Sequence, residues 1–176
     1  MDNNDLKSMI RTIPDFPKKG IMFRDITTIL QNKEGFRYVI ERFYERYKDK
    51  KIDVVVGIES RGFIFGATLA YKLDCSFVPI RKKGKLPYRT RQQEYALEYG
   101  TAAIEIHEDA IKEGQKVLIV DDLIATAGTM LATIKLIELL GGKVVECAFV
   151  VELIDLKGRD KLKDYNIFSL VEFGGE

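Results

Sequence analysis

The stretch that decides the fold is VLIVDDLIATAGT, at residues 117–129. Its first four residues, 117–120, are continuously apolar, as in a strand that is buried on both faces of a parallel sheet. Two carboxylates follow at Asp121 and Asp122, and small residues then lead into a helical pattern of apolar side chains over residues 129–140. The stretch therefore predicts a strand, a polar turn and a helix in direct succession.

The rest of the chain repeats this alternation of strands and helices. Further β-branched runs predict strands at residues 52–58, 77–80, 101–106 and 144–151. Apolar residues at helical spacing predict further helices at residues 36–47 and 63–73. Such alternation is typical of βαβ units, so we expect an α/β fold with a central, mostly parallel sheet flanked by helices. Ligands of these sheets bind beyond the carboxyl ends of the strands, which makes the residues after each strand the candidates for chemistry.

Composition limits the class of protein. The chain has 176 residues, a length typical of one domain, and its 28 basic and 27 acidic residues leave a net charge of +1. That balance provides no overall field to attract nucleic acid or an acidic membrane. No apolar run approaches the ~20 residues of a membrane span, and the first residues show no signal-peptide pattern. We therefore expect a cytoplasmic protein with no nucleic-acid and no membrane partner.

The turn after residues 117–120 has the composition of a phosphate-binding loop. Small side chains let backbone N–H groups surround an anion, hydroxyls add donors, and the following helix contributes its positive N-terminal end. Neither GxxxxGKS/T nor GxGxxG occurs in the sequence, so this is neither a Walker A loop nor a dinucleotide-binding fingerprint. The candidate phosphate ligands are Ala125, Thr126, Ala127, Gly128 and Thr129.

The acidic pair that precedes this loop needs its own explanation. Asp121 and Asp122 would repel a phosphate unless they address sugar hydroxyls, a metal ion or a developing positive charge, and a ribose phosphate offers all three. The alternative is a pair of N-terminal caps for the helix. We favour the binding role, because a cap requires one side chain placed directly before the first helical turn.

A second turn with anion-binding character follows the predicted strand that ends at Ile58. It consists of Glu59, Ser60, Arg61 and Gly62. We expect Gly62 to permit close backbone approach, Ser60 to cap the next helix and Arg61 to hold a phosphate through two parallel hydrogen bonds. Taken alone, the motif also suits a capped turn with a solvated arginine. Two such turns on parallel strands of one sheet favour a ligand with phosphate at both ends and a sugar between them.

The third feature is a local concentration of positive charge. Six of the eleven residues in RKKGKLPYRTR, at 81–91, are basic. Gly84 and Pro87 lead us to expect that the segment stays outside regular structure and forms a mobile basic lid over a polyanion. A solvated basic loop or a weak nucleic-acid contact is the alternative.

With these motifs in view, the chain resembles the adenine phosphoribosyltransferases, a family of type I phosphoribosyltransferases. The acidic-pair loop alone would indicate only the superfamily, whereas GIMFRDIT, GKLP, LEYG and LKGR are similar to the adenine family in particular. The motifs that carry the resemblance are PDFP at 14–17, GIMFRDIT at 20–27, ESRGF at 59–63, RKKGKLP at 81–87, LEYG at 97–100, VDDLIATAGT at 120–129, VEL at 151–153 and LKGR at 156–159.

The resemblance implies an activity and an architecture. The reaction joins adenine to 5-phosphoribosyl-1-pyrophosphate and releases AMP and pyrophosphate, with Mg²⁺ as the cofactor, held through the substrate. The architecture is one domain over residues 1–176, with residues 1–34 contributing to a hood around the base and residues 81–100 forming a mobile lid. The family also implies a homodimer, in which Arg81 reaches the partner's site.

The resemblance further assigns roles to individual residues. The loop at residues 125–129 would hold the 5-phosphate, while Asp121 and Asp122 would engage the ribose hydroxyls and stabilise positive charge on the ring. In similar enzymes a non-proline cis peptide lies beside the serine of the second turn. The implied pyrophosphate ligands are Glu59, Ser60, Arg61, Gly62, Arg81, Lys82 and Lys85.

Adenine and the lid complete these implied roles. Adenine would stack near Phe23, with the backbone of Met22 and Arg24 on its edge and Leu153 on its far side. Glu98 either handles the N7 proton of adenine or only orders the lid, and Tyr99 belongs to the lid. Ala127 stands where similar enzymes often carry glycine, and from this we expect a negative φ at Ala127.

Two other functions remain open at this point. A related transferase for another purine would keep both phosphate loops and differ in the hood. A non-catalytic regulator that binds phosphoribosyl pyrophosphate should carry a DNA-binding domain, and residues 1–13 are too short for a winged helix. An assay with several purine bases distinguishes among these functions.

Overall fold

The computed structural model describes residues 1–96 and 100–175, and its centre is a seven-stranded sheet. The strand order is β5-β6-β4-β3-β7-β8-β9. The four neighbouring pairs from β4 to β9 are parallel, while β6 is antiparallel to both β4 and β5. The strands are β3 (Val54–Ile58), β4 (Ser76–Lys82), β5 (Thr90–Ala96), β6 (Thr101–His107), β7 (Lys116–Ile124), β8 (Lys143–Leu153) and β9 (Ile167–Phe173). The predicted α/β fold with a mostly parallel sheet is confirmed.

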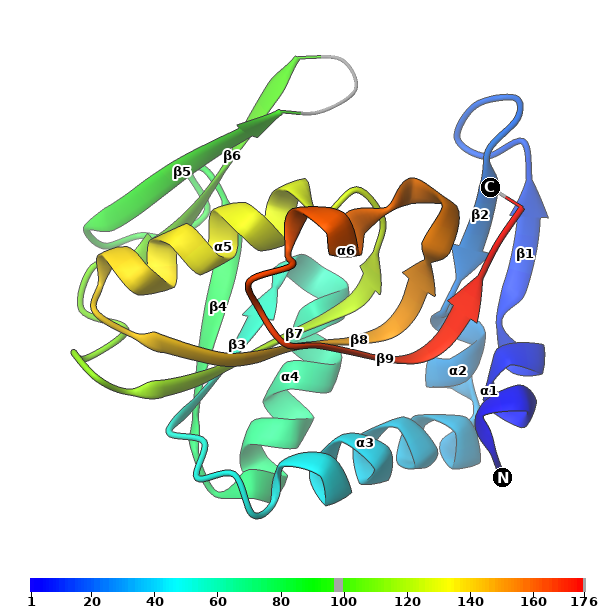
Figure 1. Cartoon of the computed structure of the whole chain (residues 1–176), viewed down its shortest axis with the longest axis horizontal. Coiled ribbons are helices and arrows are strands. Elements are labelled where there is room, and N and C mark those ends of the chain that lie inside the picture. Colours follow the sequence, from blue (N-terminus) through cyan, green and yellow to red (C-terminus); the bar gives the residue numbers. More distant parts are fainter. Residues whose placement is uncertain (97–99, 176) are drawn as a thin grey trace.

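Helices cover both faces of this sheet (Figure 1). On one face, α3 (Lys33–Tyr47) and α4 (Glu59–Leu73) bury an apolar layer that includes Phe43 and Phe65. On the other face, α5 (Gly128–Leu139) buries a second layer that includes Ile134. The central strands are covered twice, which explains why β3 is buried over its whole length and reads as a continuous apolar run.

Smaller elements stand at the β9 end of the sheet (Figure 1). The N-terminal elements are α1 (Asn3–Met9), β1 (Arg11–Pro14), β2 (Met22–Asp25) and α2 (Thr27–Gln31), and β1 and β2 form a separate antiparallel pair. After β8, a short 3-10 helix η1 (Ile154–Leu156) leads into α6 (Gly158–Lys161) on the side of α5. Within residues 1–96 and 100–175, no helix is long and apolar enough to cross a membrane.

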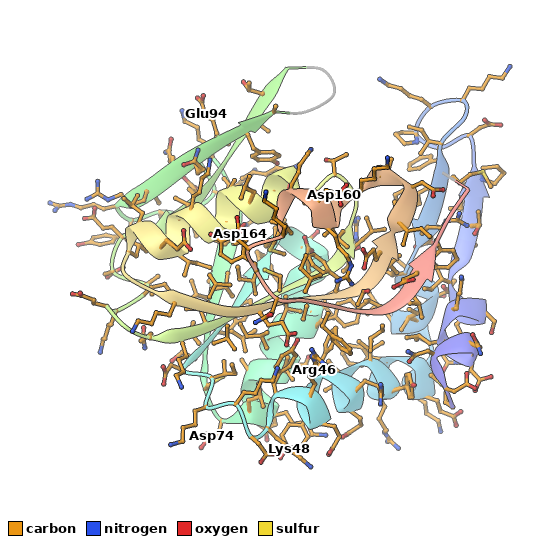
Figure 2. The ribbon with its side chains drawn as sticks, in the orientation of Figure 1. Arg46, Lys48, Asp74, Glu94, Asp160 and Asp164 are labelled. Atoms are coloured by element: carbon orange, nitrogen blue, oxygen red, sulfur yellow. The ribbon has the colours of Figure 1, made fainter. Side chains whose placement is uncertain are left out.

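A buried ion pair joins α3 to the amino-terminal half of β8. Arg46 projects from α3 toward the sheet (Figure 2), where its Nε and Nη2 donate to Glu146 at 3.0 and 2.6 Å. Lys50 donates to the same carboxylate at 3.0 Å. Burial acts to raise the pKa of Glu146, but the hydrogen bonds from Arg46 and Lys50 bring it below its ordinary value. A carboxylate that is only 3% exposed therefore stays charged, because Arg46 on α3 and Lys50 beyond the end of that helix both donate to it.

The basic segment at residues 81–91 is more regular than its glycine and proline indicated. Arg81 and Lys82 belong to β4, and Thr90 and Arg91 belong to β5. Both strands pair with β6, which supplies backbone partners that the local sequence does not reveal. The expectation that the whole segment lies outside regular structure is therefore wrong. The β5–β6 hairpin projects from the sheet, with Glu94 on its outer part (Figure 2).

Candidate active site

The register of the two central strands brings the two predicted turns together. β3 and β7 pair in parallel with Gly57 opposite Val120, so the chain leaves both strands at the same edge of the sheet. Residues from both turns line one cavity of about 280 Å³ there. Its lining residues are Ile58, Glu59, Ser60, Arg61, Lys82, Tyr95, Ile104, Asp121, Asp122 and Thr129. Both carboxylates of the predicted acidic pair thus face the second turn.

The predicted phosphate loop forms a second cavity beside the first. Its volume is about 120 Å³, and it shares Asp121 and Thr129 with the larger cavity. All of the candidate phosphate ligands line it, together with neighbouring residues of β7, β8 and α5. These residues are Asp121, Leu123, Ile124, Ala125, Thr126, Ala127, Gly128, Thr129, Met130 and Phe149.

A third cavity, of about 230 Å³, is bounded mainly by apolar side chains. It collects the four residues that the sequence assigned to the base, and the ring of Phe23 packs edge to face on Phe16 at 5.1 Å. Arg61 lines this cavity as well as the 280 Å³ one. The lining residues are Gly20, Ile21, Met22, Phe23, Arg24, Arg61, Leu123, Leu153 and Leu156. Leu156 was missed as a site residue, although it opens the LKGR motif.

Arg61 and Asp122 form an ion pair across the site. Arg61 Nε donates to Asp122 Oδ2 from the first turn of α4. Asp122 is 5% exposed, whereas the Arg61 side chain is 49% exposed. β7 continues through Ile124, so the acidic pair lies within the strand and before the helix by several residues. This position removes the helix-cap alternative for the pair.

Asp121 is in a different environment from its neighbour. Its Oδ1 accepts the backbone N–H of Asp122 at 2.8 Å. The close approach of α4 adds to its enclosure, because a Cβ on Gly62 would lie 2.9 Å from the Val120 carbonyl oxygen and 3.0 Å from Asp121 Oδ1. Burial, followed by the adjacent Asp122 carboxylate, raises the pKa of Asp121 well above its ordinary value. The charged form of Asp121 is therefore disfavoured, even though Arg61 pairs with the neighbouring Asp122.

The backbone of the phosphate loop contradicts one expectation. Ala127 has φ +62° in the left-handed region, where a negative φ was expected. The residue is the N-cap of α5, and its carbonyl accepts the Leu131 N–H at 2.9 Å, so the chain has to turn sharply between β7 and the helix. Its methyl group is buried beneath α5, which offsets a backbone strain of about 1–2 kcal/mol. Strain of this kind is common in ligand-binding loops.

The second turn also differs from what its residues indicated. α4 begins at Glu59 with Ile58 as its N-cap, so Ser60 lies inside the first turn, and its predicted capping role is wrong. The peptide bonds on either side of Ser60 are trans, and the cis bond in the described residues joins Phe16 to Pro17. Glu59 accepts the backbone N–H of Lys82 and lies 3.5 Å from Arg81 Nε. Its carboxylate therefore connects the start of α4 to the end of β4.

A buried glutamate that the sequence analysis missed holds the basic turn. Glu105 on β6 is 2% exposed and accepts the backbone N–H groups of Lys85 and Leu86, each at 2.8 Å. Thr90 Oγ1 donates to it at 3.3 Å. Burial acts to raise the pKa of Glu105, but these backbone donors bring the net pKa below its ordinary value. An acid inside the apolar run AAIEIH is the signal that could have identified it.

The remaining predicted residues are placed as follows. Lys82 lines the 280 Å³ cavity, whereas Lys85 and Arg81 do not contribute to its described lining. Glu98 and Tyr99 lie outside the residues that the structure describes. Within residues 1–96 and 100–175, no three or more carboxylate, histidine or cysteine side chains gather as a metal-binding group.

Comparison with known proteins identifies the family of the chain. A family model described as the phosphoribosyl transferase domain matches residues 25–175. An adenine phosphoribosyltransferase from Desulfosudis oleivorans is 62% identical over 172 residues, which cover 98% of this chain and 99% of that protein. The chain belongs to the adenine phosphoribosyltransferase family.

Solved structures of adenine phosphoribosyltransferases share the fold. The enzyme from Thermoanaerobacter pseudethanolicus superposes with a TM-score of 0.94 at 53% identity, covering 97% of this chain and 99% of that one. The Saccharomyces cerevisiae enzyme, in complex with D-2,5-dideoxy-2,5-imino-altritol 1,6-bisphosphate and adenine, gives a TM-score of 0.91 at 43% identity. That match covers 96% of this chain and 98% of the yeast chain.

The raised pKa of Asp121 predicts a measurable effect on stability. A carboxyl whose pKa is higher in the folded state than in the unfolded chain destabilises the fold as pH rises above the unfolded value, about 3.9. Asp121→Asn should therefore raise the Tm of the ligand-free protein at neutral pH, and the gain should shrink toward about pH 4. Thermal unfolding across this pH range measures it. Asp122→Asn is the control, because it loses the Arg61 pair and should give no gain. A lower Tm for Asp121→Asn at neutral pH would contradict the account.

Proposed function

We propose that the protein transfers the 5-phosphoribosyl group of 5-phosphoribosyl-1-pyrophosphate to adenine, giving AMP and pyrophosphate for purine salvage. One observation carries the proposal. The three cavities share residues: Asp121 and Thr129 join the first two, Arg61 joins the first and third, and Leu123 joins the second and third. Together they offer an anion loop, a polar cavity with two adjacent aspartates, and an apolar cavity. These suit the 5-phosphate, the ribose and the base of one nucleotide.

The 280 Å³ cavity suits the chemistry of the transfer. Breaking the bond between the anomeric carbon and pyrophosphate leaves positive charge on the ribose ring. In this proposal Asp121 and Asp122 stabilise that charge and engage the ribose hydroxyls. The reaction needs no protein nucleophile, because the base attacks the sugar directly. It does need water to be kept out, since water would intercept the same intermediate.

The two ends of phosphoribosyl pyrophosphate would be held by turns that follow two different strands. The loop of residues 125–129 would bind the 5-phosphate through backbone N–H groups and the hydroxyls of Thr126 and Thr129, at the N-terminus of α5. Pyrophosphate would lie against Ser60, Arg61 and Lys82 in the 280 Å³ cavity. Arg61 is bound to Asp122 before any ligand arrives, so ligand binding would exchange this ion pair for contacts with pyrophosphate.

The donor set of the cavity fits Mg²⁺ carried by the substrate. Mg²⁺ is usually held by one or two carboxylates together with phosphate oxygens and water, and the described lining of this cavity offers the carboxylates of Glu59, Asp121 and Asp122. When bound, the ion would supply positive charge to the departing pyrophosphate. Lys82 and Arg61 would contribute to the same neutralisation from the protein, and Lys85 would do so from the basic turn that Glu105 anchors.

The apolar cavity of about 230 Å³ would bind adenine. Phe23 would stack on the base, with Leu153 on the other side. The side chain of Arg24 is already engaged, because Nη1 donates to Thr12 Oγ1 at 2.8 Å and the guanidinium lies 4.4 Å from the Phe173 ring. Recognition of the base edge is therefore assigned to the backbone of Met22 and Arg24. A carbonyl and an N–H at this edge would match the 6-amino group and N1 of adenine and oppose the 6-oxo group of hypoxanthine.

We also propose that residues 81–100 act as the lid. Tyr95 lines the 280 Å³ cavity from the β5–β6 hairpin, so this hairpin already contributes to the wall above the sugar position. Glu98, with Tyr99 beside it, would then handle the N7 proton of adenine or order the lid. Cys75 and Cys147 are free thiols, which suits the reducing cytoplasm as the place of action.

The base assay tests the function. We expect kcat/KM for adenine to exceed that for hypoxanthine, guanine or xanthine by ~10⁴-fold, because a wrong base leaves buried polar groups unpaired. Phe23→Ala should weaken every base by ~1–3 kcal/mol through lost stacking. Arg24→Ala, the control, should preserve the preference for adenine. Comparable parental activity on two bases would favour the related transferase, and binding of phosphoribosyl pyrophosphate without turnover would favour the regulator.

The exposed face of α4 supports a second proposal, that the enzyme is a homodimer. Tyr71 is 89% exposed and Ile64 is 39% exposed on this helix. Arg81 lies against the same helix, with its guanidinium 5.7 Å from the Phe63 ring, and does not contribute to the described lining of its own 280 Å³ cavity. A second copy packed on α4 would cover these apolar side chains. Arg81 of the first copy would then lie toward the pyrophosphate site of the second copy.

The dimer proposal predicts a change in oligomeric state. Tyr71→Asp places a charge in the proposed interface and should give monomers in analytical ultracentrifugation, with weaker binding of phosphoribosyl pyrophosphate. Leu139→Asp is the matched control, because Leu139 is 65% exposed on α5, which covers the opposite face of the sheet. It should remain dimeric. A monomeric parent, or a Tyr71→Asp variant that stays dimeric, would contradict the interface.

A further inference from the structure

A buried carboxylate at the end of β8 holds the short segment that follows it. Glu152 is 4% exposed and accepts hydrogen bonds from Arg159 Nε at 2.6 Å and Nη2 at 2.7 Å. Ser169 Oγ on β9 donates to the same carboxylate at 2.7 Å. Bidentate, charge-assisted bonds of this kind fix both partners in one geometry. The reaction proposed above gives these three side chains no role, so their purpose needs a separate explanation.

The segment fastened by Arg159 carries one wall of the base cavity. Leu153 ends β8, η1 follows directly, and both Leu153 and Leu156 line the 230 Å³ cavity. Lys157, with φ +52°, then turns the chain into α6, where Arg159 lies. The bond between Arg159 and Glu152 therefore closes a compact loop whose apolar side chains face the proposed position of adenine.

The same segment packs closely against the phosphate loop. A Cβ on Gly158 would lie 2.3 Å from the Ala125 carbonyl oxygen and 3.0 Å from Ile124 Cγ1. Only glycine allows the backbone of α6 to approach the start of that loop so closely. α6 accordingly lies beside the loop that precedes α5 (Figure 1). A shift of α6 would be transmitted to Ala125 at one end and to Leu156 at the other.

We propose that Glu152, Arg159 and Ser169 are positioning residues that fix the spacing between the base cavity and the 5-phosphate loop. This inference rests on the proposed function, because it takes the two cavities as the sites for the two ends of AMP. Holding reactants at a fixed separation is a major source of rate enhancement. A ligand that spans both sites gains from their fixed spacing, whereas a ligand that occupies one site does not.

The experiment compares two matched glutamates on β8. Glu152→Gln and Glu146→Gln each replace a buried carboxylate that a bidentate arginine holds, and each keeps the size of the side chain. Arg46 binds Glu146 near the opposite end of the strand from the cavities. The parent and both variants are titrated by calorimetry with AMP, with adenine and with ribose 5-phosphate, and their thermal unfolding is recorded.

We expect Glu152→Gln to weaken AMP binding by about tenfold or more and to change the affinities for adenine and ribose 5-phosphate by less than about twofold. Glu146→Gln should lower the Tm to a similar degree and leave all three affinities at the parental value. Equal weakening of all three ligands in Glu152→Gln, or parental AMP binding, would overturn the inference alone. A parent that binds no AMP would overturn the proposed function and the inference with it.

A second variant tests the contact between α6 and the phosphate loop. Gly158→Ala should weaken AMP binding and leave adenine binding at the parental value, because its methyl group would displace Ala125 of the 5-phosphate loop. Gly66→Ala is its control, since the nearest atom to that methyl is a Phe77 ring carbon at 3.0 Å, remote from the loop. Gly66→Ala should bind AMP with parental affinity. Parental AMP binding by Gly158→Ala would overturn the inference even if Glu152→Gln fails to fold.

Discussion

The parallel pairing of β3 with β7 is the constraint on which the rest of the site depends. With Gly57 opposite Val120, the chain leaves both strands at one edge, and Arg61 meets Asp122 there. Helices on both faces bury this pairing completely, so the register is fixed by the core. A one-residue slip would exchange the side chains of β7 between the two apolar layers, where they would not fit, and would separate the guanidinium from the carboxylate.

Much of the site is assembled at a cost to stability before a ligand arrives. Asp121 is held where its charge is disfavoured, and Ala127 occupies the left-handed region. The surrounding fold has to enforce both, since neither is favourable on its own. In the proposed reaction both become useful: the acidic pair meets a developing positive charge, and the turned loop aims its backbone at a phosphate. Burial of this kind gives charge more effect than it would have in water.

The sequence predicted the parts of the site that depend on local pattern. Apolar runs identified β3, β4, β7 and β8 but not β9, and small and charged residues after β3 and β7 located the two turns that line the cavities. It failed where the outcome depends on a distant partner. Glu105 and Glu152 are acids in largely apolar strands, and only the fold supplies the donors that hold them. The positive φ of Ala127 likewise belongs to the sharp turn that joins β7 to α5, which no local rule contains.

In the proposed reaction two separate anion sites, in the turns that follow β3 and β7, hold the two ends of one phosphorylated sugar. Calorimetric titration of Lys82→Ala and Thr126→Val with pyrophosphate and with AMP tests it most directly, because each residue lines one cavity only. The account predicts that Lys82→Ala weakens pyrophosphate by about tenfold and leaves AMP unchanged, while Thr126→Val does the reverse. Equal losses for both ligands in either variant would contradict the two-site account.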